Sequence, residues 1–207
     1  MRTAVLIVVL VSLALAPVTA WAGGVPKVDV SNASVECDTV IGVELMKPAW
    51  TLAGTTTPAV IKLNAKLSGC AVTGATVTNL TGSLTGTITL PIANNCIFLT
   101  NPIVGGQALV KIAWKSDRTT PLEETSSTIV WDGLLASPLT PFSSGNYITH
   151  GSFLNPTVGG AFSGSGLNAN VTFAISEDVT HNITPACLFG DGIKKLHIGM
   201  GFVTLNL

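Results

Sequence analysis

The side chains that most often carry out chemistry are sparse in this sequence, and its three histidines come first. They are His150, His181 and His197. His150 stands two residues before Ser152, but a catalytic Ser–His–Asp arrangement is assembled by the fold and is not indicated by such a spacing. The Gly-Ser-Gly run at 164–166 lacks the G-x-S-x-G spacing that holds a nucleophilic serine on a strained turn. We therefore predict no catalytic serine.

The acidic residues form no convincing site either. Asp178 and His181 are three residues apart and would share one face of a helix, where His197 would complete a metal site. We interpret Asp178 and the glutamate before it as acids that complement the N-terminus of a short helix. Glu123 and Glu124 are neighbours in a loop and point apart, unlike the facing carboxylates of glycoside hydrolases. The prediction is no enzyme, no metal and no cofactor.

Aromatic side chains offer the one candidate for ligand stacking. Trp50, Trp131 and Tyr147 would present flat apolar surfaces to a sugar ring. Trp50 follows a Pro-Ala step and is expected to be exposed, whereas Trp114 shares its parity with core residues and is expected to be buried. These three residues are the predicted ligand-stacking site.

The four cysteines predict two disulfides. They are Cys37, Cys70, Cys96 and Cys187, and none forms a C-x-x-C pair that would indicate zinc or redox chemistry. Four cysteines allow three connectivities. We favour Cys70–Cys96 and Cys37–Cys187, the first local and the second joining the two ends of the chain.

The N-terminal residues predict export. Arg2 precedes an apolar run from Ala4 to Ala16, and Ala20-Trp21-Ala22 has the small-x-small pattern of a signal-peptidase site. Residues 1–22 are thus predicted to be a signal peptide and residues 23–207 a single disulfide-stapled domain, with no transmembrane segment after cleavage. The expected location is extracellular, or loosely associated with the cell envelope.

Composition indicates an all-β domain with no nucleic-acid partner. Charged residues make up only 10% of the chain, and removal of Arg2 leaves nine Lys/Arg against eleven Asp/Glu. Such a weak, scattered charge gives no basic footprint for nucleic acid. Threonine and glycine are abundant, which favours strands over helices.

Alternating apolar residues locate the strands. Ala59–Leu67 places its apolar side chains on one parity and Lys62, Asn64 and Lys66 on the other. Ala75–Leu90 changes phase, which predicts a bulge near Asn79. The last segment changes phase as well, at Gly199 and Gly201. Further strands are expected at Val40–Lys47, Gln107–Lys115, Thr128–Asp132, Tyr147–Leu154 and Ala169–Ser176.

The predicted fold is an antiparallel β-sandwich or a curled β-barrel of about 8–10 strands. It carries one short helical turn near the C-terminus, expected within Glu177–Cys187 and limited by Pro185. Glycine-bent strands suit a sheet that curls strongly.

The order of these features resembles a known group of exported proteins. An early cysteine and a strand ending in Lys47-Pro48-Ala49 are followed by Leu67-Ser-Gly-Cys70 and Asn94-Asn-Cys96. Lys111-Ile-Ala-Trp114-Lys115, Val158-Gly-Gly-Ala-Phe162 and Gly192-Ile-Lys-Lys-Leu196 then follow in turn. This pattern is similar to small secreted proteins of actinomycete-type bacteria that have no assigned function. The resemblance implies a secreted four-cysteine β domain and supplies no catalytic residue.

The sequence therefore predicts an exported, non-enzymatic structural or binding module of the envelope or extracellular space. Its partner is left open among an envelope lipid, a glycan and a protein. One alternative is a carrier that holds a small apolar ligand, such as a lipid, inside a barrel. The second alternative is a carbohydrate-binding module that uses the aromatic residues above.

Overall fold

The computed structural model describes residues 24–54, 56–90, 103–104, 106–132, 134–136, 140–141, 147–153, 156–164, 169–175 and 184–205. The predicted signal peptide at 1–22 lies outside these residues. The elements, in chain order, are β1 (Ser34–Trp50), β2 (Ala59–Thr73), β3 (Leu80–Leu90), β4 (Ile103–Val104), β5 (Gln107–Lys115), β6 (Ser126–Asp132), β7 (Leu134–Ala136), β8 (Thr140–Pro141), β9 (Tyr147–Phe153), β10 (Thr157–Gly160), β11 (Ala169–Ile175), α1 (Thr184–Leu188) and β12 (Ile193–Leu205). The predicted all-β fold with one short helical turn is confirmed.

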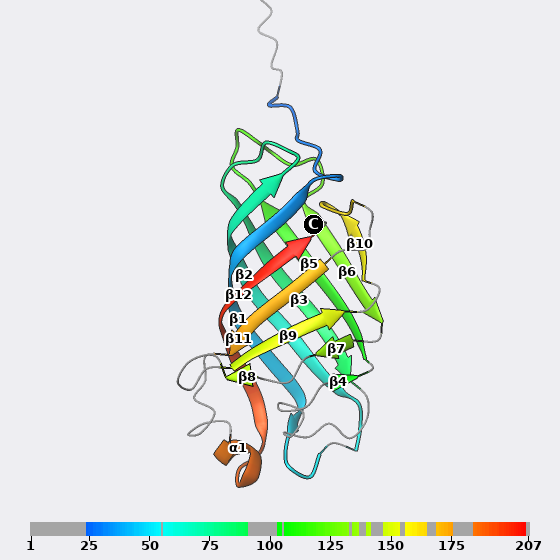
Figure 1. Ribbon diagram of the computed structural model, residues 1–207, viewed down its shortest axis with the longest axis vertical. Coiled ribbons are helices and arrows are strands. Elements are labelled where there is room, and N and C mark those ends of the chain that lie inside the picture. Colours follow the sequence, from blue (N-terminus) through cyan, green and yellow to red (C-terminus); the bar gives the residue numbers. More distant parts are fainter. Residues whose placement is uncertain are drawn as a thin grey trace, which may run out of the picture.

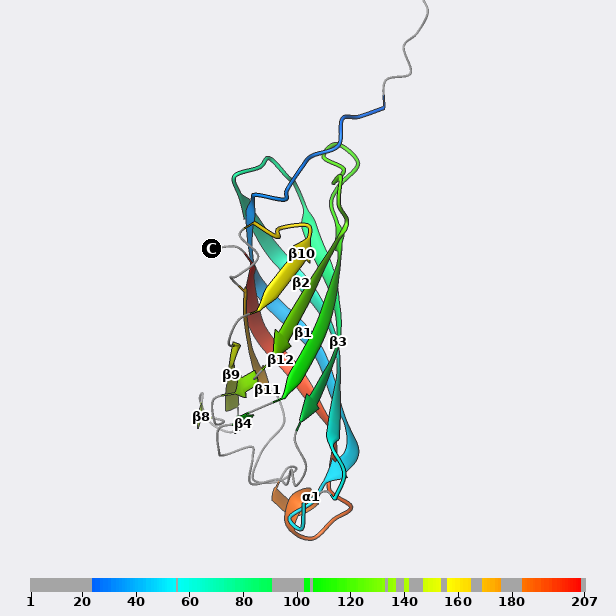
Figure 2. The same ribbon diagram turned by 90° about the vertical axis from the view of Figure 1, so that its right-hand side faces the viewer.

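The strands form a single antiparallel sheet that curls on itself (Figure 1). β12, β1, β2, β3, β5 and β6 are neighbours in that order, and β12 also pairs with β11, which pairs with β9. β6 then pairs with β10, while β7 pairs with β9 and β4. If β4–β5, β6–β7 and β9–β10 are each taken as one interrupted strand, these pairings run once around a curled barrel of eight strands. Figure 2 shows β3 and β9 on opposite sides of the curled sheet.

Strict alternation of side chains builds the core. On β5 every second residue is buried, and Ile112 and Trp114 face inward as predicted. Trp114 meets Phe162 edge-to-face, with ring centroids 5.2 Å apart. Ile129 and Phe162 are fully buried in the same cluster. These side chains belong to one core cluster that the described strands share.

Both predicted changes of phase occur at irregular backbone. Asn79 has a positive φ of 53°, and β3 begins directly after it at Leu80. The predicted strand from Ala75 was therefore too long, because residues 74–79 form the turn between β2 and β3. On β12 the pairing with β11 skips Gly199, and the buried side chains change parity across it. An inserted residue of this kind reverses the faces of a strand.

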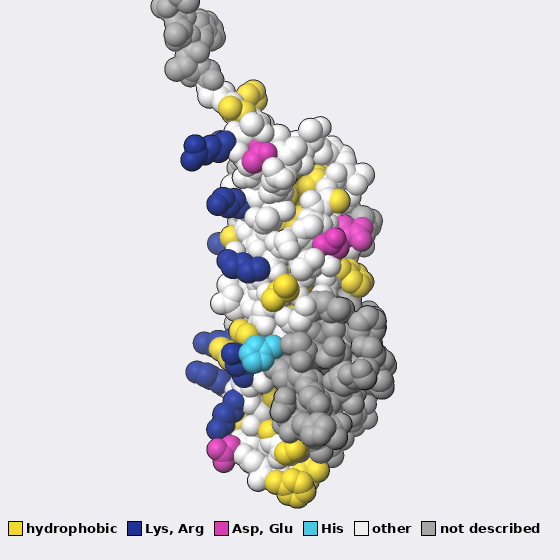
Figure 3. All heavy atoms as spheres, turned by 90° about the vertical axis from the view of Figure 1, so that its left-hand side faces the viewer, with side chains coloured by type: hydrophobic (Ala, Val, Ile, Leu, Met, Phe, Trp, Pro, Cys, Tyr) yellow, Lys and Arg dark blue, Asp and Glu magenta, His cyan; other side chains and the backbone are white. Residues whose placement is uncertain are grey.

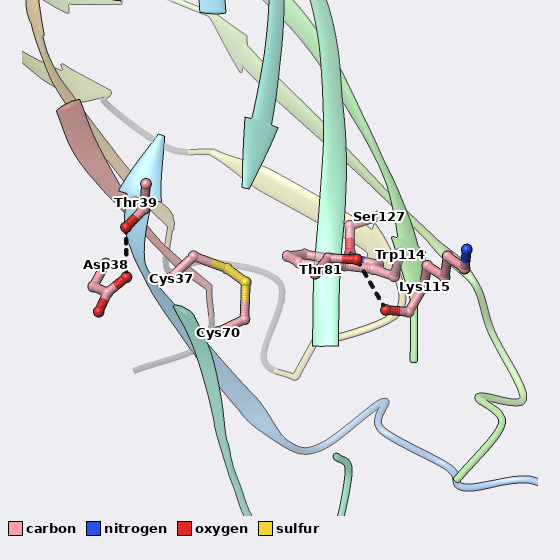
Figure 4. Close-up of a disulfide and its surroundings, with 8 residues drawn as sticks. All are labelled: Cys37, Asp38, Thr39, Cys70, Thr81, Trp114, Lys115 and Ser127. Atoms are coloured by element: carbon pink, nitrogen blue, oxygen red, sulfur yellow. Dashed lines mark hydrogen bonds between the residues drawn. A yellow bond between two sulfur atoms is a disulfide. The ribbon is translucent and has the colours of Figure 1, made fainter. Parts of the chain in front are cut away.

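The predicted disulfide pairing is wrong. Cys37 is bonded to Cys70, with a Cα–Cα distance of 3.9 Å, and the two residues face each other directly across β1 and β2 (Figure 4). The pairs Cys70–Cys96 and Cys37–Cys187 are thereby excluded, because register between neighbouring strands, which spacing does not encode, decides which thiols meet. Cys187 is also disulfide-bonded, and Cys96 lies outside the described residues.

A short N-terminal segment ties one end of the barrel together. The Val28 amide donates to the Pro121 carbonyl at 2.8 Å, and the Glu123 amide donates to the Val28 carbonyl at 2.9 Å. The Phe162 amide donates to the Val30 carbonyl at 3.2 Å. Backbone hydrogen bonds of the segment that precedes β1 therefore link the β5–β6 connection to the end of β10.

The one described helix, α1, lies at the opposite end of the barrel (Figure 1). It spans five residues and ends one residue beyond Cys187. Pro185 lies in the first turn of this helix, where proline is tolerated, so the prediction that Pro185 limits the helix is wrong. The earlier part of the predicted helix, residues 177–183, lies outside the described residues.

Candidate functional site

Two of the predicted stacking residues are core residues. Trp50 and Trp131 are each only 1% exposed, so the prediction of a solvent-facing aromatic platform is wrong for both. Trp131 continues the buried parity of β6, so alternation carries its ring inward. Trp50 is the last residue of β1 and is buried, although the alternation of β1 is interrupted just before it, where Lys47 and Pro48 are both exposed. The side chain of Tyr147 lies outside the described residues.

The histidines and acids weighed as catalytic candidates do not meet in the described part of the chain. His197 is exposed on β12, whereas the side chain of His150 and all of His181 lie outside it. Glu123 and Glu124 are both exposed in the β5–β6 connection. Among the residues whose positions are described, no three His, Cys, Asp or Glu side chains cluster as metal ligands.

A different group of side chains gathers on the outer face of β2, β3 and β5. Lys62 and Lys66 point outward from β2, and Lys111 and Lys115 point outward from β5. We call these four residues the lysine ladder. Each is exposed because its strand neighbours occupy the buried parity; Figure 4 shows Lys115 and Trp114 leaving opposite faces of β5.

Strand register arranges the ladder on both sides of β3. Lys62 lies opposite Thr87, and Lys66 lies opposite Ser83. On the other side of β3, Lys111 lies opposite Thr85 and Lys115 lies opposite Thr81. Successive hydroxyl residues along β3 therefore face a lysine from β2, then from β5, then from β2, then from β5. The four ammonium groups alternate along the strand.

The surface over β3 is hollowed. One hollow of about 420 Å³ is lined by residues that include Lys62, Lys111 and Gly86. A second hollow, of about 330 Å³, is lined by residues that include Lys66, Lys115 and Gly82. Both glycines belong to the inward parity of β3. A Cβ on Gly82 would stand 3.1 Å from the ring of Trp114, so β3 sits close against the core at this point. The two hollows follow one another along β3, each with one lysine pair.

No acidic residue occurs in β2, β3 or β5. The Lys66 ammonium donates a hydrogen bond to Ser83 Oγ at 2.8 Å, so it lies over the hydroxyl row. By contrast, Lys194 lies 3.3 Å from the Asp191 carboxylate, elsewhere on the barrel. Figure 3 shows Lys and Arg side chains along one edge of the molecule, with few acids among them.

A carboxylate clamp holds one end of this face together. Asp117, in the β5–β6 connection, accepts hydrogen bonds from the side chains of Thr78 and Asn79 in the β2–β3 connection. It also accepts from Thr119, through both the amide and the hydroxyl, and from the Thr120 amide. The hydrogen bonds from Thr119 and Thr78 hold the pKa of Asp117 well below its usual range. The clamp thus links the turns from which β3 begins and β5 ends.

The chemistry that the ladder offers is anion binding. Ammonium groups attract carboxylate, sulfate and phosphate groups as point charges, and the threonine and serine hydroxyls between them donate and accept hydrogen bonds. Sequence reasoning placed Lys62 and Lys66 correctly in water but did not identify this face. Its signal was the K-x-x-x-K spacing in two separate strands, which becomes a site only once both strands flank β3.

Comparisons with protein-family models, with curated proteins and with solved structures gave no match for this chain. The resemblance to secreted actinomycete-type proteins therefore stays a prediction. None of the helical structure in the described ranges is long and apolar enough to traverse a bilayer.

Proposed function

We propose that this protein is a non-enzymatic binding module of the envelope or extracellular space, and that its lysine ladder binds an anionic ligand. The observation that carries the proposal is the alternation of four exposed lysines about the hydroxyl row of β3. The four like charges, carried by β2 and β5 on either side of β3, repel one another, which favours a role in recognition.

Charge distribution supports a local site over a general affinity for anions. The whole chain has a formal net charge of −1, so its overall field does not attract anions. Attraction has to come from a local concentration of cations, and β2, β3 and β5 provide one without acids. The ligand is therefore expected to bind this face and to bind more weakly as salt is raised.

Export is part of the proposal. Cys37–Cys70 is a disulfide, and disulfides persist mainly in oxidising compartments outside the cytosol. The signal-like residues 1–22 agree with this compartment. Anionic polymers and anionic lipid headgroups are both common ligand chemistry there.

The test compares two variants that each lose four charges. In the first, Lys62, Lys66, Lys111 and Lys115 are replaced by Gln. In the control, Lys27, Lys47, Lys194 and Lys195, which lie outside the ladder, are replaced by Gln. Binding to immobilised dextran sulfate, with unmodified dextran as the blank, should fall at least tenfold in the first variant and less than threefold in the control. Equal losses, or no binding by the wild type, would refute the proposal.

A further inference from the structure

We infer that the ligand of the lysine ladder is an extended linear polyanion with hydroxyl-bearing repeat units, and that it lies along β3. This inference rests on the proposed function and adds the class of the ligand. It follows from three features of the same face. These are the spacing of the lysines along β3, their alternation between β2 and β5, and the hydroxyl side chains of β3 that lie between them.

The step between lysines sets the charge spacing of the ligand. Ladder positions on β3 are two residues apart, at Thr87, Thr85, Ser83 and Thr81. Each step therefore advances about 7 Å along the strand. Lysines on the same side, such as Lys62 and Lys66, are four residues and about 13 Å apart. A matching ligand carries one anionic group about every 7 Å along an extended chain.

Alternation sets how those groups are displayed. Lys62 and Lys66 approach from β2, while Lys111 and Lys115 approach from β5, and no position on β3 faces two of the four lysines. A polymer whose successive anionic groups fall on opposite sides of its axis can pair each group with one ammonium. A compact anion with clustered charges would reach at most the two lysines of one hollow.

The outward-facing side chains between the lysines favour a polyol over a nucleic acid as the ligand. Thr81, Ser83, Thr85 and Thr87 supply hydroxyls, and no aromatic side chain faces outward on β2, β3 or β5. Proteins that bind single-stranded nucleic acid use aromatic side chains as stacking surfaces for the bases, in addition to positive charge. A phosphate-linked polyol or an acidic polysaccharide needs no such surface and can exchange hydrogen bonds with the hydroxyl row.

Polymer length is expected to matter because each contact is weak. One exposed ion pair contributes only about 0–1 kcal/mol, so a monomeric anion should scarcely bind. When the anions are linked, each later contact forms at high effective concentration, and affinity rises by about 10²–10⁴-fold without new types of contact. The ladder therefore selects for chains that span all four lysines.

The first experiment titrates wild-type protein with fluorescently labelled poly(glycerol phosphate) of two and of eight repeats, and with free glycerol 3-phosphate. The longer chain should bind about 100-fold more tightly than the shorter one. Its log–log dependence on salt should have a slope near −3, the value of about −0.7 per contact for a single-stranded polyanion multiplied by four lysines. Oligothymidylate with equal charge should bind at least tenfold more weakly than the polyol.

The second experiment moves one charge without removing it. Lys111→Thr together with Ala113→Lys shifts a lysine by two residues on the same exposed face of β5, so that it joins Lys66 opposite Ser83. Net charge is unchanged, but alternation is lost, and affinity for the eight-repeat chain should fall at least tenfold. Lys111→Gln provides a second, single variant, for which the magnitude of the salt slope should fall by about 0.7.

The outcomes separate the two proposals. If the longer chain and dextran sulfate both fail to bind, the proposed function fails, and this inference fails with it. If dextran sulfate binding depends on the ladder, but polyol length and charge position have no effect, the proposed function stands and this inference is overturned. Tighter binding of oligothymidylate would also overturn it, in favour of a nucleic-acid ligand.

Discussion

Inside the barrel, the indole Nε1 of Trp114 donates a hydrogen bond to Ser127 Oγ at 2.8 Å. The same hydroxyl donates onward to the backbone carbonyl of Ala161, just beyond β10. Ser127 is fully buried, and it is one of two polar residues in the described core. One hydroxyl therefore connects β5, β6 and the end of β10.

Replacement of Ser127 by Ala should destabilise the protein by about 2–4 kcal/mol, because a buried indole N–H and a buried carbonyl each lose their partner. The measurement is urea unfolding followed by tryptophan fluorescence. Ser83→Ala, on the outer face, is the control and should change the free energy of unfolding by less than about 0.5 kcal/mol. Equal effects of the two substitutions would show that this hydrogen-bond chain does not stabilise the barrel.

Two adjacent glycines on β10 should respond oppositely to alanine. Gly160 has φ +81°, and a Cβ there would stand 2.2 Å from the Ser126 carbonyl oxygen, so Gly160→Ala should cost at least about 2 kcal/mol. A Cβ on Gly159 would meet nothing within 4 Å, so Gly159→Ala should be neutral or stabilise by up to about 1 kcal/mol. Denaturant midpoints measured on the two variants check this, and a tolerated Gly160→Ala would contradict it.

The Asp117 clamp should make stability depend on acid. The pKa of this carboxyl is lower in the folded chain than its ordinary value near 4, so the folded state favours the ionised form. Its contribution is complete above the unfolded pKa and is lost as pH falls through the folded pKa. The stability difference between wild type and Asp117→Asn should therefore be largest above about pH 5 and shrink below about pH 4.

Thermal unfolding across pH 2–7 measures this effect, with Glu123→Gln, an exposed acid in the same connection, as the control for the loss of a charge. A difference between wild type and Asp117→Asn that stays constant with pH would exclude the clamp as its source.

The Cys37–Cys70 bond makes a direct prediction for mass spectrometry. Non-reducing peptide mapping should recover the peptides of these two cysteines as one linked species, and recovery of Cys37 linked to Cys187 would contradict the structure. The double variant Cys37→Ser, Cys70→Ser opens a loop of 33 residues and should lower stability by about 3–4 kcal/mol in the chain-entropy model.

The sequence predicted what local periodicity determines. β5 spans Gln107–Lys115 as predicted, and the outward position of Lys62 and Lys66 follows from the alternation of β2. The phase changes at Asn79 and Gly199 were visible because an apolar set switches parity there. These features depend on neighbours along the chain.

What failed depends on neighbours across the sheet. The partner of Cys37 is set by the register of β1 against β2, and no spacing rule encodes that register. Trp50 was assigned to the surface from a local Pro-Ala step, but β1 continues through that step, and Trp50 pairs with Ile193 of β12 and is buried. The lysine ladder combines β2 and β5, which are separated in the sequence by β3 and β4, so only the folded sheet assembles it.

β1 pairs on one side with β2 and on the other with β12, from Val35 opposite Leu205 to Trp50 opposite Ile193. β1 and β2 are close in the sequence and can pair early, whereas β12 follows every other described strand along the chain. Closing so long a loop is entropically costly and slow, so completion of the ring is expected to be the late event in folding. Until then the free side of β1 presents open backbone donors and acceptors that a second unfinished copy could pair with. A high local concentration of incompletely folded chains is therefore expected to favour misassembly of this protein.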